Sequence, residues 1–144
     1  MISGPATIVL VRHAEPAGGA DPGLAPAGRK RAELLAFMFQ DAHITAVFTS
    51  DLRRTKETAQ PLAAKFSLVP GVLSGLDPVA HSNRVLAISS GVAVVVGHTN
   101  TVPQLIAALG VRESVQIAET EFDRMFVVSR REDGASVLSL RYRL

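Results

Sequence analysis

The sequence predicts an α/β fold: a three-layer α/β/α sandwich around a mostly parallel sheet, with an antiparallel hairpin at the C-terminus. Three short apolar runs, at residues 7–11, 46–50 and 92–97, are rich in β-branched side chains, as is typical of strands buried on both faces. A segment with helical periodicity follows each run. This alternation indicates parallel strands joined by helices that cover both faces of the sheet.

Helices are expected at three places, one after each apolar run. Residues 29–40 carry an apolar stripe with Arg31 and Glu33 off it, and residues 52–66 place apolar side chains at three- and four-residue steps. Residues 102–109 form a third, largely apolar helix. The stripe residues are Ala32, Leu34, Leu35, Met38 and Phe39 in the first helix, and Leu52, Thr55, Ala59, Leu62, Ala63 and Phe66 in the second.

The remaining elements are expected from turn and capping residues. Thr101 is a candidate N-cap for the third helix, and Gly110 is its stop. Residues 85–90 are a weaker candidate for a further helix. Near the C-terminus, Asp133 and Gly134 stand between two β-branched runs, which predicts the hairpin that joins the sheet antiparallel.

The composition fits one globular domain over residues 1–144, with 47% hydrophobic and 19% charged residues. The chain contains no cysteine, which excludes a disulfide framework, a thiolate nucleophile and a zinc–thiolate site. Residues 1–5 lack the pattern of a secretory signal, and no apolar stretch approaches the ~20 residues that span a bilayer. We therefore expect a cytoplasmic protein with no membrane partner.

The charge distribution gives a weak indication of the ligand. The formal net charge is only +2, but twelve of the fifteen basic residues are Arg. Arg holds phosphate or carboxylate through two parallel hydrogen bonds, so this bias slightly favours an anionic ligand. An Arg-rich surface without a functional role explains the bias equally well. No feature of the sequence indicates a nucleic-acid partner.

Polar and cationic side chains follow all three predicted strands. The first strand ends in Arg12 and His13, the second in residues 50–55, and the third in residues 97–100. In open α/β sheets, ligands bind beyond the carboxyl ends of the strands. Each strand end alone supports a site only weakly. Together they predict one crevice that holds two imidazoles and up to three guanidinium groups.

A crevice of this kind favours a compact dianion, and phosphate is the usual one. Arg side chains donate pairs of hydrogen bonds to its oxygens. Helix N-termini just after Ser50 and Thr101 would add backbone donors and a partial positive charge. A neutral imidazole with one N–H held by an acceptor keeps a lone pair on its other nitrogen, and can therefore act as a nucleophile.

Three segments carry a resemblance to a known family. LVRHAEP, FTSDLRRTKETAQPLA and VVVGHTNTV are similar, in order and spacing, to motifs of the histidine phosphatase superfamily, which has the phosphoglycerate-mutase-like fold. With the intervening helices, the resemblance covers nearly the whole chain. GLAPAGRKRA also resembles a family motif, from which Ala25 and Arg31 depart. The match is specific for the superfamily but gives almost no indication of the substrate.

The resemblance implies roles for four residues. His13 would be the nucleophile that becomes phosphohistidine, and Arg12, Arg54 and His98 would hold the phosphoryl oxygens. The spacing of the family motif selects Arg54 over its neighbour Arg53.

The sequence leaves two interpretations open for the roles of two hydroxyl residues. Ser50 and Thr99 could line the phosphate pocket, or they could cap the helices that follow them. The capping role is favoured.

The function implied by the resemblance is a metal-independent phosphatase that hydrolyses phosphomonoesters or phosphohistidine through a phosphohistidine intermediate on His13. The sequence has no His-x-His or His-Glu-x-x-His motif, so no metal or other cofactor is expected. The alternatives are a non-catalytic phosphate-binding regulatory module and, less favoured, a phosphoglycerate-type mutase.

A general acid for the leaving group is not evident. Many family members provide a Glu between the second and third motifs, but residues 68–85 contain none. Asp77 is the first candidate, Glu15 the second, and Glu121 or Asp123 the third. Small family members without an obvious Glu include phosphohistidine protein phosphatases, whose leaving group needs less help than an alkoxide. The expected partner is therefore a phosphorylated small molecule or a phosphohistidine protein.

Overall fold

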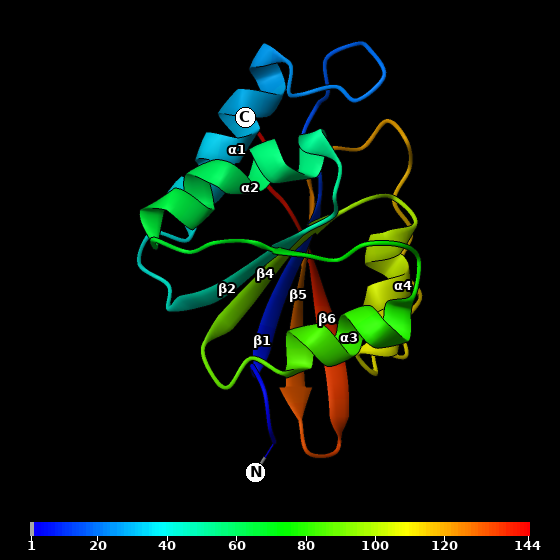
Figure 1. Cartoon of the computed structure of the whole chain (residues 1–144). Helices are drawn as coiled ribbons and strands as arrows, with labels where there is room; N and C mark the ends of the chain where they lie inside the picture. The colour runs from blue at the N-terminus through cyan, green and yellow to red at the C-terminus, as the bar shows by residue number, and fades with distance from the viewer. Residues whose placement is uncertain (1) are drawn as a thin grey trace.

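A computed structural model describes residues 2–144, and Met1 lies outside the described part. Residues 2–144 form one six-stranded sheet in the order β3-β2-β4-β1-β5-β6, together with four helices (Figure 1). The strands are β1 (Thr7–Arg12), β2 (Ile44–Thr49), β3 (Gly71–Val72), β4 (Val92–Gly97), β5 (Arg124–Arg131) and β6 (Gly134–Arg141). The helices are α1 (Pro26–Met38), α2 (Arg53–Lys65), α3 (Pro78–Leu86) and α4 (Thr101–Ala108).

The sheet has the mixed topology that the sequence predicts. Strands β1, β4, β2 and β3 are parallel, and the hairpin of β5 and β6 joins β1 antiparallel. Along the β1–β4 pair, apolar residues face one another in register, for example Val9 with Val94 and Val11 with Val96. Because β1, β4 and β2 are neighbours with one direction, their carboxyl ends meet at one edge of the sheet.

Helices cover both faces of the sheet, which confirms the three-layer sandwich. Helices α1 and α2 pack on one face and α3 and α4 on the other (Figure 1). Alternate residues of β1 divide between the two cores, as the pleat requires. Val9, Val11, Leu35, Ala59 and Leu62 belong to the α1/α2 core, and Ile8, Leu10, Val102, Leu105 and Phe126 belong to the α3/α4 core.

The structure corrects the expected first helix. Helix α1 begins at Pro26, which suits a helix start because its fixed φ is already helical. The sequence predicts Arg31 off the apolar stripe. In the structure Arg31 lies on the buried face of α1, because its guanidinium forms an ion pair with Glu15 there. Met38 was expected on the stripe, but it is exposed at the last residue of the helix.

The structure also corrects two helix starts on the other face. The N-cap of α4 is Asn100, whose side chain accepts a hydrogen bond from the backbone N–H of Thr101. Thr101 is the first residue of that helix instead. The expected helix at residues 85–90 is wrong in position, because Asp77 caps a helix that starts earlier, at Pro78.

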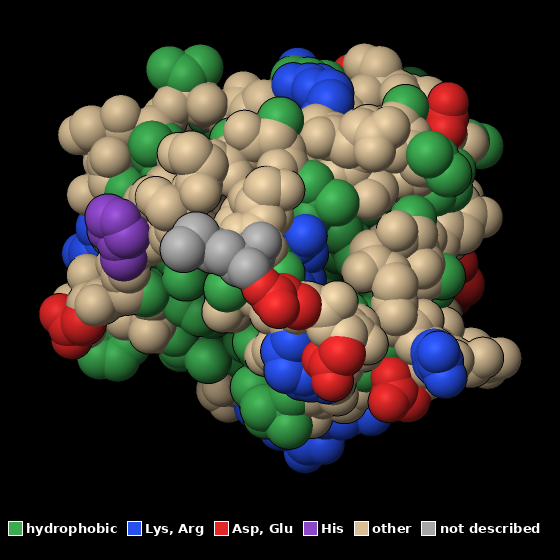
Figure 2. Space-filling model, turned by 90° about the horizontal axis from the view of Figure 1, so that it is seen from below, with side chains coloured by type: hydrophobic (Ala, Val, Ile, Leu, Met, Phe, Trp, Pro, Cys, Tyr) green, Lys and Arg blue, Asp and Glu red, His purple; other side chains and the backbone are tan. Residues whose placement is uncertain are grey.

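On the face at the amino ends of the parallel strands, side chains of one type do not form a distinct patch (Figure 2). Figure 2 views this face, where basic, acidic and hydrophobic side chains are interspersed. No helix within residues 2–144 is both long and apolar enough to cross a membrane.

Candidate active site

A cavity of about 920 Å³ opens at the edge of the sheet where β1, β2 and β4 end. The structure brings six of the seven sequence-predicted site residues into its wall; the seventh, Asp77, is not there. The six are Arg12, His13, Ser50, Arg54, His98 and Thr99. The crevice expected from three separate strand ends is therefore a single cavity.

His13 is the first residue after β1, and its position is fixed from two sides. Its backbone N–H donates to the carbonyl of Gly97 at 2.8 Å, which ties the end of β1 to the end of β4. The next backbone N–H, that of Ala14, donates to Thr58 Oγ1 on α2 at 2.9 Å. The backbone that carries the His13 ring is therefore held between the end of β4 and helix α2.

The contacts of the His13 ring define its tautomer. Nδ1 lies 2.9 Å from the carbonyl oxygen of Ala14, which can only accept a hydrogen bond, so Nδ1 carries the proton in the neutral ring. Burial, helped by the nearby charges of Arg12, His98 and Arg54, lowers the pKa of His13 to about 4, against the opposing effect of the hydrogen bond to the Ala14 carbonyl. At neutral pH the ring is uncharged, with its lone pair on Nε2.

We expect this state to be visible by NMR. Long-range ¹H–¹⁵N spectra of the His13 ring should show a neutral Nδ1–H tautomer at pH 7 and a titration midpoint near 4. The sign follows from burial, because a desolvated imidazole resists protonation. A midpoint at or above the ordinary value of about 6.5, or a proton on Nε2, would contradict this assignment.

Arg12 is the last residue of β1, and the loop before β5 holds its guanidinium. Nη1 donates to the carbonyls of Glu119 and Glu121, at 2.8 and 2.9 Å. The ring of Phe122 lies 4.0 Å from the guanidinium carbon, as in a cation–π contact. The Arg12 side chain is only 7% exposed, and its Nε has no hydrogen-bond partner among the described residues. The Arg12 guanidinium is therefore held in place, and its Nε–H is not used as a donor to any described residue.

The two adjacent arginines of α2 have different environments. Arg54 is half-buried and lines the cavity. Arg53 points to solvent and pairs with Glu57 at 2.7 Å, one helical turn along. Arg54 therefore lines the crevice, and Arg53 does not. Both stand in the first turn of α2, where the helix dipole adds positive potential.

His98 follows β4 and contacts the end of β2. Its Nε2 lies 2.9 Å from Ser50 Oγ, which is itself 2.9 Å from Thr55 Oγ1. The His98 and His13 rings meet edge to face, with centroids 5.4 Å apart. Burial lowers the pKa of His98, and the charges of Arg54 and Arg12 lower it further.

The structure answers the question left open for the two hydroxyl residues. Neither Ser50 nor Thr99 is the N-cap of the helix that follows it: Leu52 holds that position for α2 and Asn100 for α4. Ser50 Oγ contacts His98, and both hydroxyl residues line the cavity. The expected N-cap positions are therefore wrong for both, although Ser50 Oγ also accepts a hydrogen bond from the backbone N–H of Leu52 at 3.3 Å, just before α2.

The carboxylates proposed as general acids all lie elsewhere. Asp77 is exposed, accepts a hydrogen bond from the N–H of Ala80 as the cap of α3, and does not line the cavity. Glu121 pairs with Arg124 and Arg141 on the surface of the hairpin. Asp123 pairs with Arg141 and Arg143, and Glu15 with Arg31.

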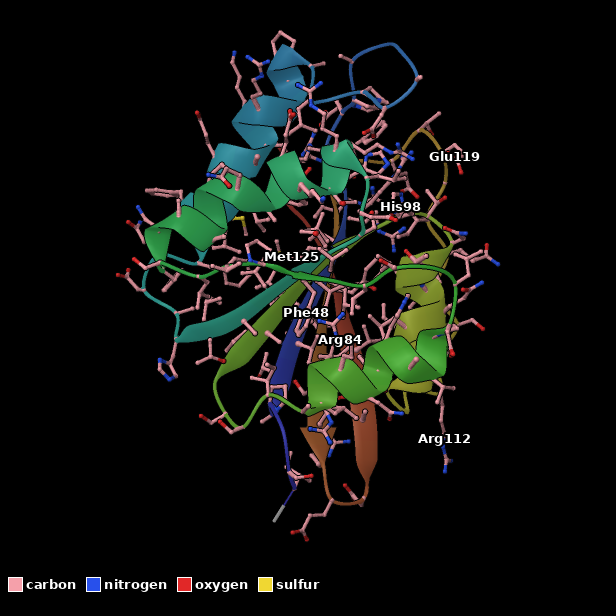
Figure 3. All side chains as sticks on the ribbon, viewed as in Figure 1. Phe48, Arg84, His98, Arg112, Glu119 and Met125 are labelled. Atoms are coloured by element: carbon pink, nitrogen blue, oxygen red, sulfur yellow. The ribbon has the colours of Figure 1, made fainter. Side chains whose placement is uncertain are left out.

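Glu119 is the site residue that sequence reasoning missed. Among the described residues, the carboxylate side chains in the cavity wall are those of Asp51 and Glu119. Glu119 accepts a hydrogen bond from Thr99 Oγ1 at 2.8 Å and lies 3.4 Å from Arg12 Nη2. Figure 3 shows Glu119 and His98 at the same end of the sheet. No local pattern marks residue 119, because it enters the site through Arg12, which is distant in sequence.

Glu15 and Arg31 form an ion pair beside the loop that follows His13. Arg31 Nε and Nη2 each donate to one Glu15 oxygen at 2.9 Å, and Nη1 donates to the carbonyl of Tyr142. Gly28 lets α1 approach this loop, since a Cβ there would lie 2.3 Å from the Glu15 carbonyl oxygen. Arg31, a departure from the family motif, thus ties the loop after His13 to the C-terminal segment.

The fold and the cavity together define a class of protein: a three-layer α/β domain with two histidines and two arginines at the carboxyl ends of parallel strands. In residues 2–144, no group of three or more His, Cys, Asp or Glu is placed to hold a metal ion. Residues 8–84, more than half of the chain, match the histidine phosphatase superfamily, branch 1. The chain belongs to this superfamily.

Solved structures share the fold over almost the whole chain. The protein histidine phosphatase SixA in complex with tungstate has a TM-score of 0.76 at 20% identity, covering 94% of this chain and 96% of its own. A putative phosphohistidine phosphatase SixA from Agrobacterium tumefaciens has a TM-score of 0.66 at 20% identity, covering 97% and 100%. A mycobacterial glucosyl-3-phosphoglycerate phosphatase in complex with VO3 has a TM-score of 0.69 at 17% identity, covering 96% and 99%. No curated protein sequence matches the chain.

Proposed function

We propose that the protein is a metal-independent phosphatase that works through a phosphohistidine intermediate on His13. The observation that carries this proposal is the His13 ring, held at Nδ1 by the Ala14 carbonyl, in one cavity with Arg12, Arg54 and His98. Membership of the histidine phosphatase superfamily supports it, as do structural neighbours described as phosphatases. A nucleophile beside fixed cations is what transfer of a phosphoryl dianion requires.

The reaction has two displacements at phosphorus. In the first, the Nε2 lone pair of His13 attacks in line, a P–N bond forms, and the bond to the leaving group breaks. The leaving oxygen or nitrogen keeps the electron pair and takes a proton from solvent. In the second, water attacks phosphorus, the P–N bond breaks with its electron pair returning to Nε2, and the water proton leaves with solvent. The products are the dephosphorylated substrate and inorganic phosphate.

The other side chains hold charge that develops on the phosphoryl oxygens. Arg12 and Arg54 donate to these oxygens; the Arg12 guanidinium is already held in place by the Glu119 and Glu121 carbonyls, and Arg54 lines the same cavity. His98 is uncharged in the unliganded site, since burial and both arginines lower its pKa. A bound dianion would raise this pKa, so His98 takes up a proton as phosphate binds and becomes the third cation.

The substrate is a phosphomonoester or a protein phosphohistidine. Asp77 lies outside the cavity wall, so we do not carry it forward as a general acid. Of the two carboxylates in the cavity wall, Asp51 and Glu119, the latter is engaged by Thr99 and Arg12, so we favour a leaving group that needs no protein acid. Two structural neighbours, described as a protein histidine phosphatase and a putative phosphohistidine phosphatase, support this choice. The cytoplasmic location and the lack of nucleic-acid and membrane partners stay predictions.

Phosphate release tests the proposed function. The purified chain should release phosphate from a panel of phosphomonoesters and phosphohistidine peptides, with activity that survives a metal chelator and is inhibited by vanadate. His13→Ala should abolish release, whereas His43→Ala, at an exposed position away from the cavity, should leave it unchanged.

Two results would contradict the proposal. Release that stops on chelation would point to a metal-dependent reaction. Phosphate binding without release from any substrate would instead favour the regulatory, non-catalytic module.

A further inference from the structure

The donors of Arg12 divide into those that the protein uses and those that it leaves for a ligand. Nη1 donates to the carbonyls of Glu119 and Glu121, at 2.8 and 2.9 Å, so both of its hydrogens are used. Nε has no hydrogen-bond partner among the described residues, although the side chain is only 7% exposed. Nε and Nη2 share one edge of the planar guanidinium. This edge therefore remains for the paired oxygens of a phosphoryl group.

The side chain of Glu119 contacts Arg12 at this same edge. Its Oε2 lies 3.4 Å from Nη2, well beyond the roughly 2.7–2.9 Å of a strong charge-assisted hydrogen bond. Its Oε1 accepts a hydrogen bond from Thr99 Oγ1 at 2.8 Å, and the side chain is 81% exposed. Figure 3 shows Glu119 on the segment before β5, at the end of the sheet that carries His98. The contact between Glu119 and Arg12 is therefore long and open to water.

The charges around Arg12 give this carboxylate a role before a ligand binds. Burial lowers the pKa of Arg12, the Glu119 carboxylate opposes this shift more strongly than any other charge, and Arg54 adds to it. Arg12 and Arg54 line one cavity, so their like charges repel each other there. The negative charge of Glu119 partly compensates this repulsion. A bound phosphoryl dianion would supply the same compensation itself.

A phosphoryl group and the Glu119 carboxylate cannot both bind this edge of Arg12 without repulsion. Both are anions, and the burial of Arg12 limits the screening of their charges by water. The carboxylate is the partner that moves, because its contact is long and exposed, and exposed ion pairs contribute little free energy. Phosphate binding at Arg12 therefore exchanges one anion for another, which is less favourable than binding to an edge with no anion beside it.

We propose that Glu119 is a resident counter-ion of Arg12 that the phosphoryl group displaces, and that its negative charge weakens the binding of inorganic phosphate and so promotes product release. The role in product release rests on the proposed function. The effect on phosphate binding does not, because it is measured without turnover.

Calorimetry with the full chain and inorganic phosphate tests the binding effect. Glu119→Gln should lower the Kd for phosphate by about three- to tenfold at low salt, because it removes a negative charge beside the bound dianion. The ratio of the two Kd values should shrink as salt rises from about 0.02 to about 0.5 M. Gln keeps the size of the side chain and an oxygen that can accept from Thr99. The backbone carbonyl of residue 119, which holds Nη1, stays in place.

Glu113 provides the matched control. It is exposed and belongs to the same connection between α4 and β5, but it does not line the cavity. Glu113→Gln removes the same charge and should leave the Kd for phosphate unchanged. An unchanged Kd in Glu119→Gln would overturn the proposal, and so would equal tightening by both substitutions. Weaker binding in Glu119→Gln would overturn it too, since that result would show that the carboxylate positions Arg12 for phosphate.

Steady-state kinetics tests the role in product release. The inhibition constant of inorganic phosphate, measured as a product inhibitor, should fall in Glu119→Gln by the same factor as the calorimetric Kd. An unchanged inhibition constant would overturn the role in release. If the calorimetric shift is found but neither protein turns over any substrate, the result counts against the proposed function, and Glu119 remains the counter-ion of a phosphate-binding site. If neither protein binds phosphate at all, both proposals are wrong.

Discussion

Replacing Arg54 by Ala should lower kcat/KM for phosphate release by about 10²–10³-fold, the usual cost of removing one preorganised donor to a developing oxyanion. Arg54 lines the cavity beside His13, and its charge acts on both histidines of the site. The loss should appear mainly in kcat if the contact strengthens as charge moves onto the equatorial oxygens. Steady-state kinetics with one substrate measures it.

The adjacent residue provides the control. Arg53 carries the same charge in the same helical turn, but it is directed to solvent and pairs with Glu57. Arg53→Ala should change kcat/KM by about twofold or less, since exposed ion pairs contribute little. If the two substitutions had similar effects, general electrostatic attraction would explain the rate, and the placement of Arg54 would have no special role.

Replacing Arg31 by Met should lower the free energy of unfolding by about 2–4 kcal/mol. Breaking a buried ion pair costs about 3–5 kcal/mol, and partial solvent access to Glu15 reduces that cost. The substitution removes two hydrogen bonds to Glu15 and one to the carbonyl of Tyr142. Denaturant unfolding measures the change. Arg131→Met, which removes an exposed pair with Asp133, should cost less than about 1 kcal/mol.

The stability due to this pair should depend on pH with a definite sign. The hydrogen bonds from Arg31 lower the pKa of Glu15 in the folded state below its ordinary value of 4.5. The contribution is therefore present above about pH 4.5 and is lost as the pH falls through the folded-state pKa. The stability difference between the wild type and Arg31→Met should shrink on acidification. A difference that does not change down to pH 2 would contradict a role for the ionised pair.

The sheet and the gathering of the cationic residues could be predicted because both follow from short-range patterns. A valine-rich run such as residues 92–97 is typical of a strand that is buried on both faces. Once β1, β2 and β4 are parallel, their carboxyl ends must lie at one edge, so His13, Arg54 and His98 converge without any knowledge of loops.

The elements that could not be predicted depend on partners distant in sequence. Arg31 reads as a surface residue until Glu15 and the Tyr142 carbonyl are known to lie beneath α1. Glu119 stands in a segment without regular structure, and the guanidinium of Arg12 binds its carbonyl there. The start of α3 is a different case: Asp77 followed by Pro78 is itself a helix-start signal, and this signal was available in the sequence.

The most direct test of the account is to trap the intermediate. The full chain mixed with a phosphoryl donor and quenched within milliseconds should carry one phosphoryl group, on His13, located by mass spectrometry under conditions that preserve phosphohistidine. The label should be absent from His13→Ala and should form and decay at rates consistent with turnover. Phosphate release at the full rate with no phosphoryl group on His13, or with the group on another residue, would contradict the account.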